Sequence, residues 1–111
     1  MHTRRIDENF AVTGQITPAQ VEEVAAAGFK SILCARPDME EPGQPSFGLI
    51  AQAAEKAGLK AVHIPISGQL SEGALIRMER ALAELPMPML GYCRSGARAS
   101  SLYSAIQHSR A

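Results

Sequence analysis

The sequence predicts an α/β fold of three layers, in which helices cover both faces of a small and mainly parallel sheet. Three observations support this: β-prone runs alternate with segments of helical periodicity, glycines and prolines separate them, and 46% of the 111 residues are hydrophobic. Strands joined through helices must run parallel, with right-handed crossovers. A chain of this length can bury one core, so residues 1–111 are expected to form a single domain.

The first strand and the first helix are expected near the N-terminus. Residues 10–14, "FAVTG", form a short β-prone run that ends in a glycine. Thr17 is a suitable N-cap, because a proline follows at the first helical position and Gln20 is placed to complete a capping box. Valines then recur at helical spacing until Gly28, so a helix is predicted over residues 18–27.

The second strand is predicted at "FKSILC", residues 29–34, which is rich in β-forming residues. Three prolines and a glycine make residues 35–45 the longest predicted loop. Ser46 is a suitable N-cap for a second helix that ends at Gly58, because apolar side chains recur on one face of this segment.

The second half of the chain repeats the alternation. Residues 60–66, "KAVHIPI", are predicted as a strand, and Ser71 is a suitable N-cap for the third helix. Residues 88–93, "PMLGYC", form the last predicted strand, and residues 97–109 form the last helix. The predicted order is therefore β-α-β-α-β-α-β-α.

The charge balance excludes several classes of function. Eleven basic residues match eleven acidic ones, so the sequence predicts no binding to nucleic acid or to anionic membranes. No apolar run is long enough to span a membrane and the N-terminal segment is polar, which favours a cytoplasmic location. Two cysteines are too few for a disulfide framework, so both are expected to be free thiols.

The segment "CRSGAR" carries the strongest chemical signal, because it follows the last predicted strand, at the edge where parallel sheets bind ligands. Gly96 lets successive N–H groups converge on an anion, and the start of the next helix adds donors. Arg98 can offer a bidentate fork, and the same field favours a nucleophilic Cys93 thiolate with a pKa below the roughly 8.5 of a free thiol. The other candidates in this anion-binding loop are Arg94, Ser95 and Ala97.

Other candidate residues have both a functional and a structural interpretation, and Cys93 itself could be a structural thiol beside surface arginines. Cys34 is a candidate second thiol or a small buried hydrophobe, as free cysteines commonly are. His63 suggests a metal ligand, but without a recognised ligand spacing a core or rim position is favoured. Arg36 and Asp38 form an ion pair in the site wall, or Asp38 bonds to backbone within a turn.

Longer segments of the sequence resemble the phosphatase-like domain of bacterial "beta-lactamase hydrolase-like" proteins, a relative of dual-specificity phosphatases. The segments that carry the resemblance are "VTGQITPAQVEEVAAAGFKSIL", "RPDMEEPGQPSF", "AAEKAGLKAVHIPI" and "CRSGAR". The resemblance implies a phosphatase-like fold, with Cys93 as the nucleophile and Arg98 as the oxyanion-binding arginine. It also implies a partner, namely a metallo-β-lactamase-type domain or enzyme that oxidises persulfides.

Three positions depart from the usual loop of cysteine phosphatases. Four residues, not five, separate the cysteine from the arginine; Tyr92 stands where a histidine is usual, and Ala99 where a serine or threonine is usual. The neighbourhood in which such phosphatases carry their general acid reads "HIPISGQ" and contains no acid. Asp38, Glu40 or Glu41 in the long loop are the candidate substitutes.

The loop itself resembles the C-R-x-G-x-R loop of rhodaneses, which carry a sulfane sulfur on the cysteine as a persulfide and need no general acid. The sequence therefore favours a thiol sulfurtransferase that takes sulfur from an anionic donor such as thiosulfate or a persulfide. The first alternative is a cysteine-dependent phosphatase that acts on a phosphate ester through a phosphocysteine. The second is a non-catalytic domain that binds an anion or a partner. None of these interpretations includes a metal or another cofactor.

Overall fold

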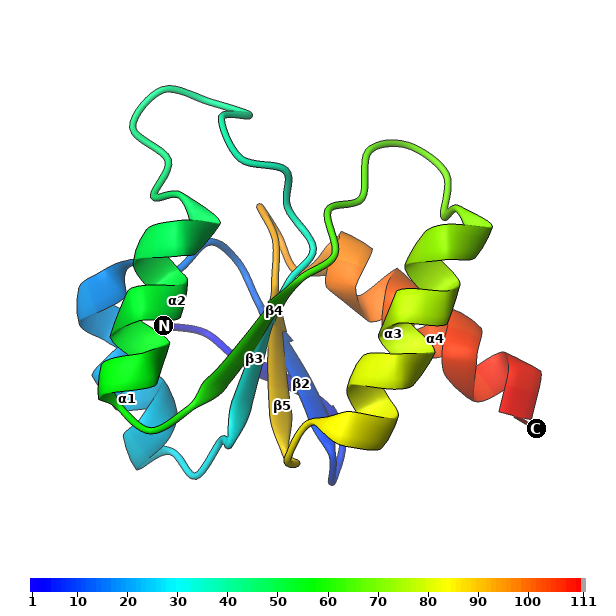
Figure 1. Ribbon diagram of the computed structural model, residues 1–111, viewed down its shortest axis with the longest axis horizontal. Helices are drawn as coiled ribbons and strands as arrows, with labels where there is room; N and C mark the ends of the chain where they lie inside the picture. The colour runs from blue at the N-terminus through cyan, green and yellow to red at the C-terminus, as the bar shows by residue number, and fades with distance from the viewer. Residues whose placement is uncertain (111) are drawn as a thin grey trace.

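The computed structural model describes residues 1–110, which fold around a five-stranded sheet (Figure 1). The strand order is β1-β2-β5-β3-β4, so the last strand of the chain lies at the centre. β1 is antiparallel to β2, and the other neighbouring pairs are parallel. The strands are β1 (Arg4–Asp7), β2 (Phe10–Thr13), β3 (Ser31–Cys34), β4 (Lys60–His63) and β5 (Met89–Tyr92).

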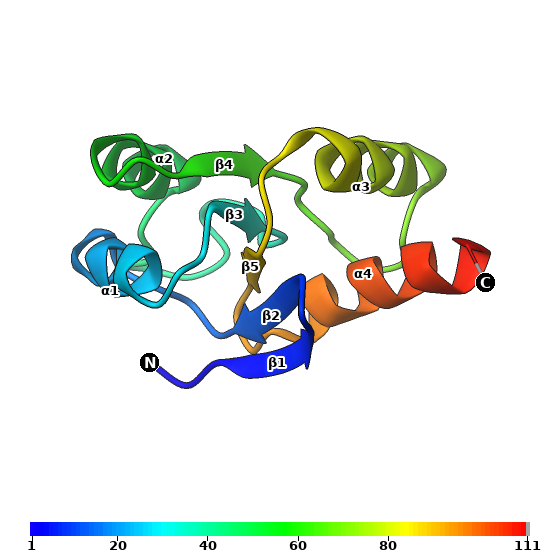
Figure 2. The same cartoon turned by 90° about the horizontal axis from the view of Figure 1, so that it is seen from below.

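Helices cover both faces of the sheet: α1 and α2 lie on one side, and α3 and α4 on the other (Figure 2). The helices are η1 (Pro18–Gln20), α1 (Val21–Ala26), α2 (Phe47–Lys56), α3 (Glu72–Glu84) and α4 (Ala97–Arg110). The predicted three-layer α/β architecture with a mainly parallel sheet is confirmed. Within residues 1–110, no helix combines the length and apolar character that a membrane span requires.

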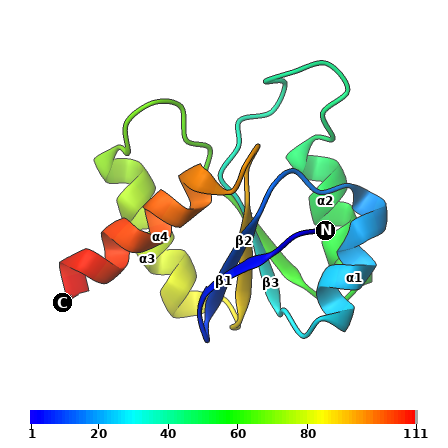
Figure 3. The same ribbon diagram turned by 180° about the vertical axis from the view of Figure 1, so that it is seen from behind.

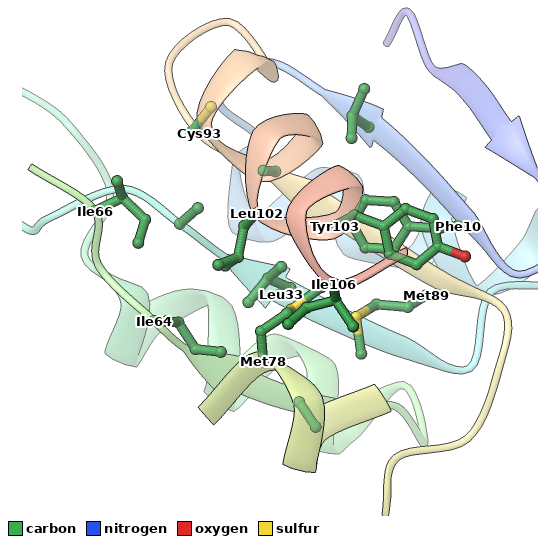
Figure 4. Packing of buried hydrophobic residues seen from close by; sticks show 14 of the residues in the cluster. Phe10, Leu33, Ile64, Ile66, Met78, Met89, Cys93, Leu102, Tyr103 and Ile106 are labelled. Atoms are coloured by element: carbon green, nitrogen blue, oxygen red, sulfur yellow. The ribbon is translucent and has the colours of Figure 1, made fainter. Parts of the chain in front are cut away.

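Each face of the sheet has its own hydrophobic core, because successive strand residues point to opposite faces. The core under α3 and α4 (Figure 4) includes Phe10, Leu33, Met78, Leu102 and Ile106. The core under α1 and α2 includes Val21, Val24, Ile32, Ile50 and Leu90. Each large apolar side chain that is fully buried contributes about 1.5–3 kcal/mol, so the two cores fix the sheet and with it the loops at its edges.

Side-chain caps begin three helical segments where the sequence predicts them. The Thr17 hydroxyl accepts a hydrogen bond from the Gln20 backbone, and the Gln20 side chain accepts one from the Thr17 backbone, which completes the capping box. Ser46 and Ser71 cap α2 and α3 in the same way, each accepting from the N–H three residues on. The helix predicted over residues 18–27 differs in one detail, since its first turn is a separate 3₁₀ turn, as is common at helix N-termini.

The strand β1 is not predicted by the sequence. Its residues, "RRID", are all exposed, so no alternation of polar and apolar side chains marks it. β1 lies beside β2 at the edge of the sheet (Figure 3). The Tyr103 hydroxyl donates to the Asp7 carboxylate at 2.6 Å and ties the end of this strand to α4.

Besides residues 14–17 after β2, three loops gather at the carboxyl ends of the parallel strands. Residues 35–46 follow β3, residues 64–71 follow β4 and residues 93–96 follow β5. In Figure 1 the two longer loops rise on either side of the end of β5. The short loop after the central strand therefore lies where a parallel sheet places its ligands.

Candidate active site

The loop of residues 93–98 joins the central strand to α4. Cys93 directly follows β5, and Arg98 lies in the first turn of α4. The Cys93 side chain is buried at the margin of the core under α3 and α4 (Figure 4), and its sulfur accepts a hydrogen bond from the Gly96 N–H at 3.1 Å. The thiol is therefore both buried and held by a backbone donor of its own loop.

Gly96 makes the tight turn of this loop possible. Its φ is +93°, in a region that side chains rarely adopt, and an added Cβ would lie 3.3 Å from the Thr13 carbonyl oxygen. Gly14 is packed even more closely, because a Cβ there would lie 3.0 Å from the carbonyl oxygen of Arg94. The loop therefore packs closely against the end of β2.

Arg98 is held by groups from both longer loops. Its Nη1 and Nη2 atoms donate to the two carboxylate oxygens of Glu40, at 2.7 and 2.8 Å. Nη1 also donates to the carbonyl oxygen of Ile66 at 3.0 Å. All three loops of the carboxyl edge thus meet at this guanidinium, and tertiary contacts, not α4 alone, fix its position.

Glu40 is ionised in this arrangement. Hydrogen bonds from Arg98 and Arg36 lower its pKa from 4.5 to about 2. The pKa of Glu41 also lies below its ordinary value, chiefly because Glu41 accepts a hydrogen bond from Arg36. As they are placed here, neither carboxyl group holds a proton that it could donate at neutral pH.

Arg36 is a second arginine that binds the Glu40 carboxylate. Although only 1% of this residue is exposed, its Nε and Nη2 atoms donate to Glu40 and Glu41, both at 2.7 Å. Its Nη1 donates to the side-chain oxygen of Gln15 at 3.0 Å. Each nitrogen atom of this buried guanidinium therefore donates a hydrogen bond, two to carboxylates and one to an amide oxygen, and Arg36 lies in the wall of the site.

Asp38 bonds to backbone instead of forming the ion pair with Arg36. Its carboxylate accepts a hydrogen bond from the Phe47 N–H at 2.8 Å, at the start of α2. The carboxylates that pair with Arg36 belong to Glu40 and Glu41. At the start of α2, unpaired N–H groups and the positive end of the helix dipole favour an anion such as the Asp38 carboxylate.

Cys34 ends β3 on the opposite face of the sheet from Cys93. It is in register with Tyr92, and both belong to the core under α1 and α2, whereas Cys93 belongs to the other core. The Cys34 sulfur donates to the carbonyl oxygen of Arg36 at 3.3 Å, and burial raises its pKa. This position favours the structural interpretation of Cys34 over that of a second reactive thiol.

His63 ends β4 beside the wall of the site. Its Nε2 lies 2.8 Å from the carbonyl oxygen of Arg36, and its ring stacks on Phe47 with the centroids 4.7 Å apart. Within residues 1–110, no three histidine, cysteine, aspartate or glutamate side chains are grouped to hold a metal ion. The structure thus places His63 in a packed, hydrogen-bonded setting of the kind expected for a rim residue.

The remaining loop residues face outward. Arg94, Ser95 and Ala97 are exposed, and the Ala97 N–H donates to the Ser95 hydroxyl at 3.3 Å. Their side chains are accessible from solvent, and their part in anion binding stays a prediction.

Two contributors to the site are not identified by sequence reasoning. The Gln15 side chain binds Arg36, and the Ile66 carbonyl binds Arg98. Gln15 lies two residues after β2, and Ile66 three residues after β4. The carboxyl ends of parallel strands lie at one edge of the sheet, so the position of these residues just after a strand could have identified them.

Sequence comparison relates the chain to a described family. Residues 2–110 match the family described as beta-lactamase hydrolase-like protein, phosphatase-like domain. The chain is 39% identical over 104 residues to a beta-lactamase hydrolase-like protein of Agrobacterium fabrum, covering 93% of this chain and 24% of the relative. A relative of the same name from Xylella fastidiosa is 36% identical over 100 residues, covering 89% and 23%. The chain thus spans about a quarter of the length of these curated relatives.

Solved structures of phosphatases have the same fold. A candidate phosphatase from Neisseria meningitidis Z2491 superposes with a TM-score of 0.81 at 34% identity, over 90% of this chain and 72% of that chain. The core catalytic domain of the PP-IP phosphatase SIW14 from S. cerevisiae, in complex with citrate, gives 0.72 at 18% identity, over 96% and 64%, a likeness of fold alone. The resemblance seen in the sequence is thereby confirmed, and the chain belongs to the family of phosphatase-like domains of beta-lactamase hydrolase-like proteins.

Proposed function

We propose that this chain is a cysteine-dependent phosphatase in which Cys93 attacks phosphorus and forms a phosphocysteine. The observation that carries the proposal is the loop after the central strand, where the Cys93 sulfur meets the Gly96 N–H beside the Arg98 guanidinium. Backbone donors and a guanidinium fork are the groups that stabilise the charge of a transferring phosphoryl group. The phosphatase-like fold of the relatives supports this reaction over the sulfur transfer that the loop sequence alone favours.

The reaction consists of two displacements. The Cys93 thiolate forms the S–P bond while the P–O bond to the leaving group breaks, and the leaving group departs with the electron pair. Water then attacks phosphorus, the S–P bond breaks, and the thiolate and inorganic phosphate are released while the proton of water goes to solvent. Arg98 donates to the phosphoryl oxygens in both steps.

The state of Glu40 restricts the substrate class. Because Glu40 is ionised at neutral pH, it does not protonate a departing alkoxide, and the loss of a general acid costs roughly a hundredfold or more in rate. Leaving groups that are stable as anions avoid this cost. We therefore expect phosphoanhydrides, acyl phosphates and phosphates of acidic phenols to react much faster than phosphoserine peptides.

A series of aryl phosphates with increasingly basic phenols tests this proposal. The expected result is vanadate-sensitive phosphate release whose kcat falls steeply as the phenol becomes more basic, and no release by Cys93→Ser. Arg98→Ala is expected to lower kcat/KM and to weaken inhibition by vanadate. Release of phosphate at the wild-type rate by Cys93→Ser would remove the site assignment.

Sulfane sulfur transfer is the second candidate function, and the four-residue spacing between Cys93 and Arg98 favours it. Here the thiolate attacks the outer sulfur of thiosulfate, the S–S bond breaks, and sulfite leaves with the electron pair. An acceptor thiolate or cyanide then takes the sulfur from the Cys93 persulfide. No acid is needed, because sulfite is stable as an anion. A metallo-β-lactamase-type partner that oxidises persulfides belongs to this candidate.

Measuring the mass of the intact protein distinguishes sulfur transfer from phosphate hydrolysis. A gain of one sulfur on Cys93 after incubation with thiosulfate, reversed by a reductant, together with thiocyanate formation from cyanide, would replace the phosphatase proposal by sulfur transfer. Neither adduct nor phosphate release would leave the third interpretation, a domain that only binds an anion or a partner.

A further inference from the structure

Some N–H groups of Arg98 donate to oxygen atoms of the protein, and the others, here called the open donors, do not. A guanidinium carries five N–H donors. Glu40 takes one from each terminal nitrogen, and the Ile66 carbonyl takes the second one of Nη1. Among residues 1–110, no oxygen atom accepts a hydrogen bond from the Nε–H or from the second N–H of Nη2, and the further side chain that interacts with this guanidinium is that of Cys93. These two donors lie parallel along one edge, which is the geometry that binds two oxygens of a phosphate or another oxyanion.

The open donors belong to a guanidinium that lies next to the thiol. The Cys93 sulfur accepts a hydrogen bond from the Gly96 N–H, two residues before Arg98, and Cys93 also raises the pKa of Arg98, after the larger effect of Glu40. The side chain of Arg98 is 26% exposed, whereas Cys93 is fully buried. The guanidinium is therefore the more accessible of the two groups, and its open edge is available to an anion that binds at the sulfur.

The carboxylate that holds Arg98 is itself firmly held. The same Oε1 atom of Glu40 that accepts from Arg98 also accepts from Arg36, which is buried in the wall. The Glu40 N–H donates to the Gln44 side chain at 3.1 Å, and Met39 before it has a φ of 63°, which bulky residues rarely adopt. The loop thus maintains an unfavourable backbone conformation next to a residue whose side chain and backbone are both fixed.

We propose that Glu40 is a positioning residue for the oxyanion site, which holds the terminal nitrogens of Arg98 so that its open edge faces the anion bound at Cys93. The inference rests on the proposed function, because it concerns the geometry of the same loop. Glu40 is then neither an acid nor a ligand of the substrate. The opposite hypothesis is that the carboxylate competes with the substrate for Arg98, and it predicts tighter anion binding once the negative charge is removed.

The test compares Glu40→Gln with Glu41→Gln as a matched control, since Glu41 pairs with Arg36 but not with Arg98. Binding of tungstate and of inorganic phosphate is measured by calorimetry, and kcat and KM are measured with an aryl phosphate. Losing a charge-assisted bidentate pair is expected to weaken oxyanion binding roughly tenfold in Glu40→Gln. Glu41→Gln is expected to stay within about twofold of the wild type, and circular dichroism checks that both variants fold.

A double-mutant cycle with Arg98→Ala separates positioning from a general structural role. If Glu40 acts through Arg98, Glu40→Gln has no further effect on oxyanion binding in the Arg98→Ala background. A tenfold loss that persists in that background, or tighter binding by Glu40→Gln alone, overturns the proposal.

The binding measurement also distinguishes failure of this inference from failure of the proposed function. A wild-type chain that binds tungstate but turns over no aryl phosphate contradicts the phosphatase proposal, while the Glu40 comparison still supports or overturns the positioning role. A wild-type chain that binds neither oxyanion overturns both.

Discussion

At the scale of single residues, Arg98 is the point at which the three loops of the carboxyl edge meet. It contacts Glu40 from the loop after β3 and Ile66 from the loop after β4, and it lies beside Cys93. A lysine at this position keeps the charge but lacks the rigid fork. Arg98→Lys is therefore expected to lower kcat/KM for an aryl phosphate by roughly ten- to a hundredfold, measured by steady-state kinetics. Unchanged kinetics would show that charge alone is required.

The pairing of Glu40 predicts how the stability of the fold depends on pH. Its pKa is about 2 in the folded chain, against 4.5 when unpaired, so its pairing stabilises the fold fully above about pH 4.5. That stabilisation is lost as the pH falls from about 4.5 towards about 2. The difference in the free energy of unfolding between wild type and Glu40→Gln, measured with urea, is expected to be constant near neutral pH and to shrink over that acid range. A difference independent of pH would contradict the pairing.

At the scale of elements, the conformation of the loop depends on glycine. Gly96→Ala places a side chain at a φ of +93° and 3.3 Å from the Thr13 carbonyl oxygen. We expect it to lower the free energy of unfolding by about 1–2 kcal/mol and to reduce oxyanion binding. Gly48→Ala in α2 is the control, because its Cβ meets nothing closer than 3.7 Å and alanine favours a helix. Equal stabilities of the two variants would contradict the strained turn.

Elements whose signals are local could be predicted from the sequence. The capping box at Thr17 and the caps at Ser46 and Ser71 each depend on residues three positions apart, and all three are observed. β1 could not be predicted, because its pairing with β2 and not the pattern of its own exposed side chains makes it a strand.

The candidate site also has a part that could be predicted from the sequence and a part that could not. The sequence places Cys93, Gly96 and Arg98 in order on one loop. The bond between Glu40 and Arg98 joins residues 58 positions apart, so no spacing rule reveals it, and the carboxyl group expected as an acid is instead the partner of two arginines.

At the scale of the whole molecule, one hydrogen bond links the edge strand to the last helix. Tyr103→Phe removes the bond to Asp7 but keeps the ring stacked on Phe10, with the centroids 4.1 Å apart. We expect a loss of about 1–2 kcal/mol in the free energy of unfolding. Tyr92→Phe is the matched control, since the Tyr92 hydroxyl is buried and makes no hydrogen bond among residues 1–110, so its removal is expected to be neutral or slightly stabilising. A larger loss for the control would contradict this description.

The whole fold also explains why the loop occupies the place that it does. β5 lies between β2 and β3, so the loop that follows it packs against the end of β2, and Arg98 after it reaches Glu40 in the loop after β3.

The central claim, that Cys93 is the nucleophile of a phosphatase, is tested most directly by peptide mass mapping after rapid acid quench. Wild type and Cys93→Ser are each incubated with 4-nitrophenyl phosphate and, in parallel, with thiosulfate. A phosphoryl adduct is expected on the peptide that contains Cys93, present only in the wild type and only with the phosphate ester. A sulfur adduct without any phosphoryl adduct, or an adduct that persists in Cys93→Ser, would contradict it.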